Sequence, residues 1–421
     1  MRNKIVISFL SRILIAIVNF LLVVVLSQRL GSEGKGLCSQ FIALLTFIQL
    51  FCDVIGGPSL VVLCKNFNNK QLYFLSVIWN LILSILISSF IYFLNVPSGK
   101  DLFLLILIAF LNAQVSSNQN ILTGNEKYNS VSLLNLIQSS LIFTITLVIL
   151  NSPVNRHYKY YLMALLLSFL VIFITGSLII FKTKNRTKLE NSATIIRQSF
   201  RLGIKNQIGT ILQQINSRIS YLLLTPAAVG IFSNATSIGE STWLIAYSFS
   251  SILFGRISNE NNEEKRIRLT LQFFKWTYAL SIFACVVLLF IPDSFYAWLF
   301  GKEFIGIAEI LVFQVPGLIA FASFIILGHY FSGKGEFEKN TIAILVGLSI
   351  TCLGWLFIFI YNLEKNMFFI ATLISVSSIG TVCTVMVLFK KHTGVLWKNF
   401  MLNKKDFHEF NSFFLTKDKS L

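Results

Sequence analysis

Twelve apolar stretches, each near the length needed to cross a bilayer, fill the chain from Ile5 to Phe389. A membrane-spanning helix needs about 20 predominantly apolar residues. The stretches cover residues 5–27, 37–63, 72–94, 102–122, 131–150, 160–181, 201–224, 229–254, 273–291, 304–331, 341–361 and 367–389. Because lipid offers no partners to unpaired backbone groups, these stretches predict an all-α integral membrane protein with about twelve transmembrane helices. The composition agrees, since only 13% of residues are charged, about half the fraction in a soluble protein.

The net charge of +17 follows the predicted topology. When the loops are numbered from a cytoplasmic N-terminus, those on the cytoplasmic side hold 23 Lys and Arg residues and those on the other side hold 7. Positive charge gathers on the cytoplasmic side of membrane proteins, so both termini are predicted to be cytoplasmic. The basic tail 390–421 is expected to meet anionic lipid headgroups. Because the charge is explained in this way, no nucleic-acid partner is predicted.

Sequence patterns of enzymes are missing from the chain. The six cysteines lack CxxC spacing, the four histidines are widely separated, and no HExxH, Walker or GxSxG pattern occurs. The extramembrane segments are too short for a catalytic or nucleotide-binding domain. We therefore expect no catalytic residues, metal site or cofactor, and a secondary transporter in place of an enzyme.

Residues 182–200 form a predicted cytoplasmic linker that divides the chain into two sets of six spans. The expected lobes are 1–181 and 201–389, followed by the tail. An offset of 194 residues superposes Gly36 on Gly230, where the first and seventh spans are each followed by a short external turn. Two halves of six spans have the same orientation, as in parallel repeats. The alternative is a coincidental similarity of two short turns.

Four motifs carry a resemblance to a known family. They are LSQRLGSEGKG (26–36), AAVGIFSNATSIGE (227–240), WLFGKEFIGIAEIL (298–311) with GHYFSGKGEFEKNT (328–341), and KKHTGVL (390–396) with the later Lys405-Asp406. As a set they resemble the Wzx-type polysaccharide/O-antigen flippases, the polysaccharide transporter branch of the multidrug/oligosaccharidyl-lipid/polysaccharide superfamily. Phe254-Gly255-Arg256 lacks the proline common there, and Lys365-Asn366-Met367 lacks the usual small residues, which leaves the cargo open.

The resemblance implies two six-helix lobes around a central cavity that opens alternately to each side of the bacterial inner membrane. The implied activity is a flippase that moves an undecaprenyl-diphosphate-linked oligosaccharide to the periplasmic leaflet for surface polysaccharide assembly. The implied partners are this lipid-linked oligosaccharide, membrane lipids, a polysaccharide polymerase and a chain-length regulator.

Polar residues on the first and seventh spans are the candidate substrate-binding groups. Ser8, Arg12, Ala16 and Asn19 share one helical face, and a guanidinium suits a diphosphate because it presents a planar fork of donors. Alternatively, Arg12 snorkels to the headgroups. Span seven is the least lipid-like of the twelve, and its candidates are Lys205, Asn206, Gln213, Gln214 and Arg218. Alternatively, these groups bond to neighbouring helices and Lys205 anchors the helix end.

Two carboxylates, Glu240 and Asp53, are the candidates for coupling transport to H⁺ or Na⁺, since a charged group inside a membrane is costly without a partner. A structural salt bridge to Arg12, Lys205 or Arg218 is the alternative for Glu240. Gly56-Gly57-Pro58 predicts a break in the helix after Asp53. The amides and hydroxyls of residues 112–120 are expected either to meet sugar hydroxyls or to bond between helices.

Two rival functions remain open. A multidrug or small-cation exporter of the same superfamily favours an acidic, aromatic cavity, whereas the internal charges of this chain are more basic. A membrane-embedded polysaccharide polymerase or ligase usually needs a sizeable external loop, and none here exceeds about a dozen residues. A structural scaffold does not explain the polarity of span seven.

Overall fold

The computed structural model describes residues 2–64, 67–94, 101–152, 156–183, 192–260, 262–361, 366–401 and 403. Across these residues the regular structure is helical, and no strand occurs. The first half comprises α1 (Arg2–Gly56), α2 (Ser59–Leu63), α3 (Asn69–Phe93), α4 (Leu102–Gly124), α5 (Tyr128–Leu150), α6 (Tyr158–Lys182) and α7 (Ser192–Leu223). The second half comprises α8 (Pro226–Ser241), α9 (Trp243–Asn259), α10 (Glu263–Leu289), α11 (Asp293–Phe300), η3 (Lys302–Phe304), α12 (Ile307–Gly333), α13 (Phe337–Ile360), α14 (Met367–Thr393) and η4 (Trp397–Phe400).

Each of the twelve predicted spans lies on helix, and the predicted all-α membrane fold is confirmed. In the described part of the chain, nine helical segments are long and apolar enough to cross a membrane. One of them covers Ile13–Leu63 and contains two predicted spans, because α1 breaks at Gly31, where φ is 68°. A continuous helix of 55 residues would be about 80 Å long, far more than a bilayer's thickness. The chain is therefore a multi-pass membrane protein.

The chain forms two compact units. The first comprises Met1–Ser233 and Tyr296–Ile305, and the second comprises Asn234–Phe295 and Gly306–Leu421. This division differs from the predicted lobes, because α7 packs against α1 and belongs to the first unit. Compactness and lobe movement are different properties, so the six-plus-six division stays a prediction. Residues 184–191 of the linker and 404–421 of the tail, including Lys405-Asp406, lie outside the described residues.

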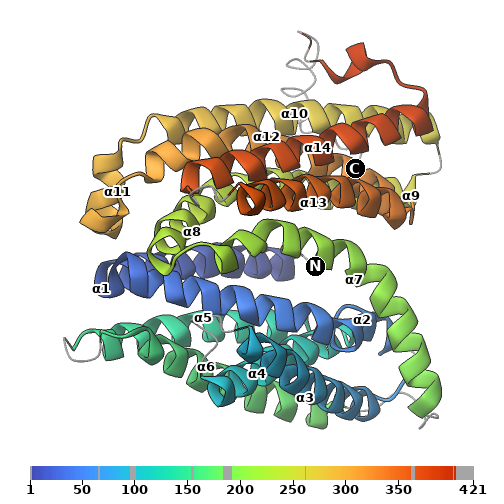
Figure 1. Cartoon of the computed structure of the whole chain (residues 1–421). Helices are drawn as coiled ribbons and strands as arrows, with labels where there is room; N and C mark the ends of the chain where they lie inside the picture. Colours follow the sequence, from blue (N-terminus) through green and yellow to red (C-terminus); the bar gives the residue numbers. More distant parts are fainter. Residues whose placement is uncertain are drawn as a thin grey trace. The chain divides into compact units, whose positions relative to one another are not determined.

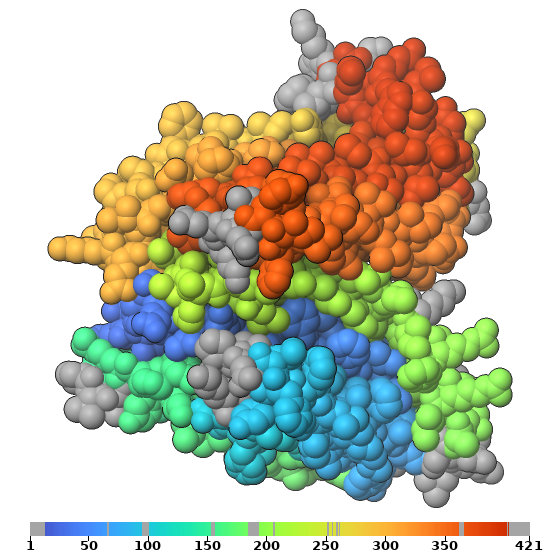
Figure 2. Space-filling model, viewed as in Figure 1, coloured from blue at the N-terminus to red at the C-terminus, as the bar shows by residue number. Residues whose placement is uncertain are grey.

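In the first unit, α1 packs along α4, α5 and α7, and α4 packs against α3 and α6 (Figure 1). The unit's residues up to Ser233 run from blue to green in the space-filling view (Figure 2). Its core includes Phe41, Ile48, Leu105, Leu162 and Leu165, each at most 2% exposed. Lipid tails are as apolar as these core residues, so moving the residues from lipid into the core gains little free energy. Close packing and hydrogen bonds between helices therefore hold the unit together.

In the second unit, α12 packs against α9, α10 and α14, while α13 packs mainly against α14 (Figure 1). Among the candidate spans of the described residues, helix α12 is the most enclosed, and 72% of the residues in its most apolar stretch are buried. Buried rings of Phe331, Phe389 and Tyr330 contact one another where α12 and α14 end. This aromatic cluster joins the ends of α12 and α14, where the chain continues into η4.

Candidate functional site

The break in α1 positions the first motif against the third. After Gly31, the Ser32 N–H and hydroxyl both donate to Glu303 Oε2, at 2.7 and 2.9 Å. Gln28 Nε2 donates to the carbonyl of Leu299 at 2.8 Å. The backbone bond from Ser32, together with its hydroxyl bond, lowers the pKa of the Glu303 carboxyl below its ordinary value. Two motifs whose bonded residues are 271 positions apart in the sequence thus form one hydrogen-bonded turn.

The second half of α1 crosses the start of α8 at two glycines. A Cβ atom on Gly36 would lie 1.6 Å from the carbonyl oxygen of Pro226, and one on Gly230 would lie 2.0 Å from that of Ser32. The two backbones therefore touch with no room for a side chain. Gly36 and Gly230 are the pair superposed by the 194-residue offset, so the predicted repeat-related positions meet in space.

A buried cation lies beside this crossing. Lys35 is 6% exposed, and its Nζ donates to Ser39 Oγ at 2.7 Å and Ser233 Oγ at 3.3 Å. The sequence interpretation placed Lys35 in an external turn and omitted it from the candidates. The helix resumes directly after Gly31 and carries Lys35 into the packed crossing, so Lys35 does not lie in an open turn. The sequence feature that could have indicated this site is the pair of serines at the repeat-related positions 39 and 233, which both bond to Lys35.

Helix α7 is held against α1 along its length in the first unit. In the first half of α7, a Cβ on Gly203 would lie 1.6 Å from the carbonyl oxygen of Val54. Near its end, Gln40 Nε2 donates to the carbonyls of Tyr221 and Leu224, at 3.0 and 3.2 Å. These contacts keep a helix that is too polar for lipid next to a partner that can bond with it.

The predicted binding residues of α7 are only partly enclosed. Gln213, Gln214 and Arg218 are half-buried, and Arg218 donates to the hydroxyl of Tyr221 at 2.8 Å. The Arg218 guanidinium also lies 5.2 Å from the centre of the Tyr221 ring. Tyr221 thus positions the guanidinium through both its hydroxyl and its ring.

The remaining predicted binding residues give less information. Asn19 is exposed on α1. The side chains of Arg12, Lys205 and Asn206 lie outside the described residues, although their backbones belong to α1 and α7. Whether these groups meet around one substrate stays a prediction.

Asp53 lies at the end of α1, opposite a polar stripe on α4. Ser116 Oγ donates to Asp53 Oδ1 at 3.2 Å, and Asn112 Nδ2 donates to Gln49 Oε1 at 2.7 Å. The predicted break after Asp53 is confirmed, because α1 ends at Gly56 and α2 begins at Ser59. Among the described residues, the ion pairs do not include Asp53. The carboxylate is therefore bound by neutral donors at a helix break.

The other face of α4 holds an amide network. Asn80 on α3 donates to Gln114 Oε1 and Ser117 Oγ, each at 3.0 Å. Gln114 Nε2 in turn donates to Asn118 Oδ1 at 3.2 Å, and Asn118 Nδ2 donates to Ser177 Oγ on α6 at 3.1 Å. All five side chains are less than 10% exposed. Of the two expectations for residues 112–120, hydrogen bonding between helices holds for this face.

Glu240 lies beside a second helix break. The predicted span 229–254 consists of α8 and α9, which are interrupted at Thr242, whose hydroxyl donates to the carbonyl of Gly239 at 2.8 Å. Trp243 Nε1 donates to the carbonyl of Leu318 on α12 at 3.0 Å. Glu240 is half-buried two residues before the break. Broken helices free backbone groups inside a membrane, and transporters place such breaks at binding sites.

The third and fourth motifs meet through charged residues in the second unit. Lys334 Nζ lies 2.8 Å from Glu263 Oε1, and Lys339 Nζ lies 2.6 Å from Glu336 Oε2. Lys334 and Lys339 also contact the two ring nitrogens of His392, at 2.8 and 2.7 Å. Burial raises the pKa of Glu336, but bonding to Lys339 and the nearby positive charges outweigh it and lower the pKa overall. Each motif of the resemblance therefore contacts another one.

Comparisons with known proteins place this fold. The chain is similar to an inward-facing multidrug resistance MATE transporter of the MOP superfamily, with a TM-score of 0.73, 16% identity, and 89% of this chain and 94% of the other covered. It is similar to the lipid II flippase MurJ in an inward closed conformation, with a TM-score of 0.72, 16% identity, and coverage of 98% and 91%. A MOP superfamily transporter from Pyrococcus furiosus gives a TM-score of 0.60, with 16% identity and coverage of 93% and 94%.

No curated protein matches the chain at a significant level. A family described as "Polysaccharide biosynthesis protein" matches residues 1–259, which is more than half of the chain. The match includes the first motif, the second motif and all of α7. The chain therefore belongs to the polysaccharide biosynthesis protein family.

Proposed function

We propose that this protein is a flippase that moves an undecaprenyl-diphosphate-linked oligosaccharide repeat unit to the periplasmic leaflet of the bacterial inner membrane. Both termini are cytoplasmic in this proposal, and transport proceeds by alternating access for surface polysaccharide assembly. The family assignment supports a role in polysaccharide biosynthesis. The fold it shares with MurJ and MATE transporters supports translocation in place of catalysis.

The polarity of α7 carries the proposal. A helix that presents half-buried Gln213, Gln214 and Arg218 within a membrane bundle needs polar surroundings. In the proposed mechanism, Arg218 and Arg12 bind the diphosphate, since guanidinium forks match phosphate oxygens. Lys205 adds charge, and Asn19, Asn206, Gln213 and Gln214 meet the first sugars.

The coupling groups of the proposal are Asp53 and Glu240. Each carboxylate lies within three residues of a helix end, where freed backbone carbonyls help to coordinate Na⁺ or stabilise a bound proton. Binding of H⁺ or Na⁺ to one of these groups would favour one orientation of the cavity over the other. A polysaccharide polymerase and a chain-length regulator would act on the delivered repeat unit.

The test is glycan export in cells whose own flippase gene is deleted and replaced by variants of this chain. Arg218→Ala and Arg12→Ala are expected to lower export at least about tenfold, because each removes a charge-assisted bond to phosphate. Arg218→Lys keeps the charge and loses the fork, so it separates the two contributions. Lys302→Ala, an exposed cation outside the proposed site, is the matched control.

Export at the wild-type level by a stably inserted double alanine variant would remove both guanidinium groups from the mechanism. The same cells test the second candidate function, that of a multidrug exporter, which the shared MATE fold favours. Resistance to cationic drugs that depends on Asp53 or Glu240, with unchanged glycan export, would support that function over the flippase.

A further inference from the structure

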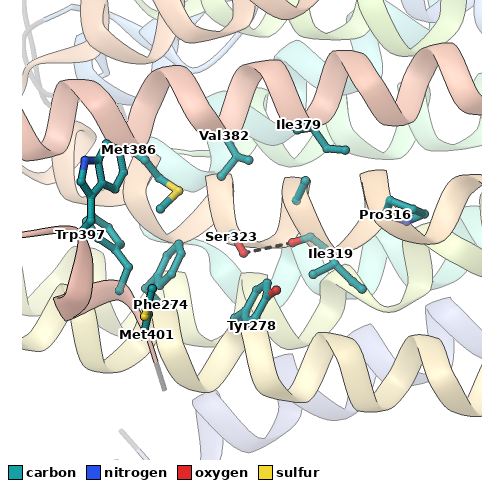
Figure 3. Close-up of a pocket in the computed structure, with 12 residues that line it drawn as sticks. Phe274, Tyr278, Pro316, Ile319, Ser323, Ile379, Val382, Met386, Trp397 and Met401 are labelled. Atoms are coloured by element: carbon teal, nitrogen blue, oxygen red, sulfur yellow. Dashed lines mark hydrogen bonds between the residues drawn. The ribbon is translucent and has the colours of Figure 1, made fainter. Parts of the chain in front are cut away.

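An apolar groove of about 680 Å³ runs along α10, α12 and α14 in the second unit (Figure 3). Its walls include Phe274, Tyr278, Ile319, Val382 and Met386. The hydroxyl of Ser323, which also faces the groove, donates to the carbonyl of Ile319 at 3.1 Å and is satisfied by its own helix. The volume falls within the range of about 300–1,000 Å³ that is typical of small-molecule sites. The groove therefore suits a flexible hydrocarbon chain.

The C-terminal helix η4 closes one end of the groove. Phe400 is buried, and its ring centre lies 5.4 Å from that of Phe274 and 5.9 Å from that of Phe389. Trp397 lines the groove from the same short helix, and Lys390 Nζ lies 4.9 Å from the centre of its ring. The aromatic contacts hold η4 against the middle of α10 and the end of α14.

A basic cavity of about 700 Å³ adjoins the groove beyond η4. It is lined by three cations, Arg268, Lys275 and Lys398, and by one carboxylate, Glu264. Met401 lines both cavities, so the apolar groove and the basic cavity are neighbours. Together they present excess positive charge at one end and hydrocarbon at the other.

The order of these residues along α10 matches the shape of a lipid. Arg268 lies near the start of the helix, and Tyr278 lies ten residues, about 15 Å, further along it. Arg268 thus lies nearer the helix start than the apolar groups, and Lys275 follows Phe274 directly along the helix. Basic cavities between transmembrane helices on the cytoplasmic side are recognised as sites for anionic headgroups.

From this arrangement we infer that the second unit binds one anionic phospholipid of the surrounding bilayer. Its phosphodiester lies among Arg268, Lys275 and Lys398, and one acyl chain occupies the groove along α10, α12 and α14. The carrier lipid of the proposed cargo has similar chemistry. The phospholipid is the assigned occupant because the cargo residues are proposed on α1 and α7, whereas this site uses neither helix. This choice of occupant rests on the proposed function, whereas the site itself rests on the apolar groove and the basic cavity.

Native mass spectrometry of the purified full-length protein tests this site. Phosphatidylglycerol and phosphatidylcholine with identical acyl chains are titrated separately, and wild type is expected to bind the first phosphatidylglycerol at least about tenfold more tightly. Arg268→Gln with Lys398→Gln is expected to weaken phosphatidylglycerol binding about 25-fold, since each cation near the membrane surface contributes about fivefold. Binding of phosphatidylcholine is expected to change little.

The matched control is Lys265→Gln with Lys391→Gln, which removes the same charge from α10 and α14 outside the cavity. Equal losses in the two double variants would overturn the inference. Ala320→Phe fills the groove and is expected to weaken both lipids, while Val376→Phe on the exposed face of α14 is its control. If the Ala320→Phe variant does not insert into the membrane, the charge variants alone test the lipid site. Tighter binding of undecaprenyl phosphate than of phosphatidylglycerol would overturn the phospholipid assignment in favour of the cargo lipid.

Discussion

Ser39 and Ser233 lie 194 residues apart in the sequence and form a hydrogen bond of 2.9 Å between their hydroxyl oxygens. The same offset relates Gly36 to Gly230, the glycines at which α1 and α8 cross. Equivalent positions of the two predicted repeats therefore meet each other in the first unit. Lys35 donates to both serines and ties the pair to a buried charge.

The crossing predicts that Gly230 does not tolerate a methyl group. A Cβ 2.0 Å from the carbonyl oxygen of Ser32 would force the two backbones apart, so Gly230→Ala should cost about 1–3 kcal/mol of unfolding free energy. Gly328→Ala on α12 is the control, because its Cβ would meet Asn340 at an ordinary 3.5 Å. Thermal unfolding in detergent measures both, and equal midpoints would show that α1 and α8 separate without cost.

Glu303 predicts a dependence of stability on pH. Because its bonds to Ser32 lower the pKa of the carboxyl in the folded state, they stabilise the fold above the pKa of the unfolded chain. That contribution is lost as the pH falls through the lowered pKa, below about pH 4. Wild type should therefore be more stable than Glu303→Gln at pH 7, and the difference should vanish at the acidic end. Glu309→Gln, at an exposed carboxyl, serves as control. A difference that is constant with pH contradicts the prediction.

The pair of Lys334 and Glu263 should be worth more than an exposed pair. The Lys334 side chain is only 16% exposed, and its contacts with Glu263 and His392 restrict it. A double-mutant cycle with alanine at both positions should give a coupling of about 0.5–1 kcal/mol. The pair of Lys159 and Asp101, at 51% and 37% exposure, should give less and should weaken more in salt. The reverse order would contradict the role of burial.

The amide network predicts a cost for losing Asn80. Asn80→Ala leaves Gln114 Oε1 and Ser117 without the donor from Asn80, at a buried site. Hydrogen bonds between membrane helices contribute about 0.6 kcal/mol on average and up to about 1.7, so the loss should lie in that range. Ser349→Ala, which removes an exposed hydroxyl bonded within its own helix, is the comparison. Chemical unfolding of the two variants measures the difference.

Much of the fold could be predicted because the bilayer imposes a simple rule. Apolar length identified the helices, and the low apolarity of α7 distinguished it from the other spans. Glycine and proline after Asp53 predicted a real break, since these residues interrupt helices locally. No such glycine and proline run precedes Thr242, which separates α8 from α9, and there Trp243 and Gly239 contact the distant Leu318 of α12.

The sequence by itself determined that the chain is a helical membrane protein with a polar seventh span. The free-energy cost of a residue in lipid depends on its own side chain, so it follows from the sequence alone. Only the tertiary structure decided which polar groups form hydrogen bonds between helices. It enclosed Lys35 and the amides around Asn80, and it left Arg218 half-buried beside Tyr221. A side chain's partners lie far away in the sequence, so its use depends on packing that no local pattern records.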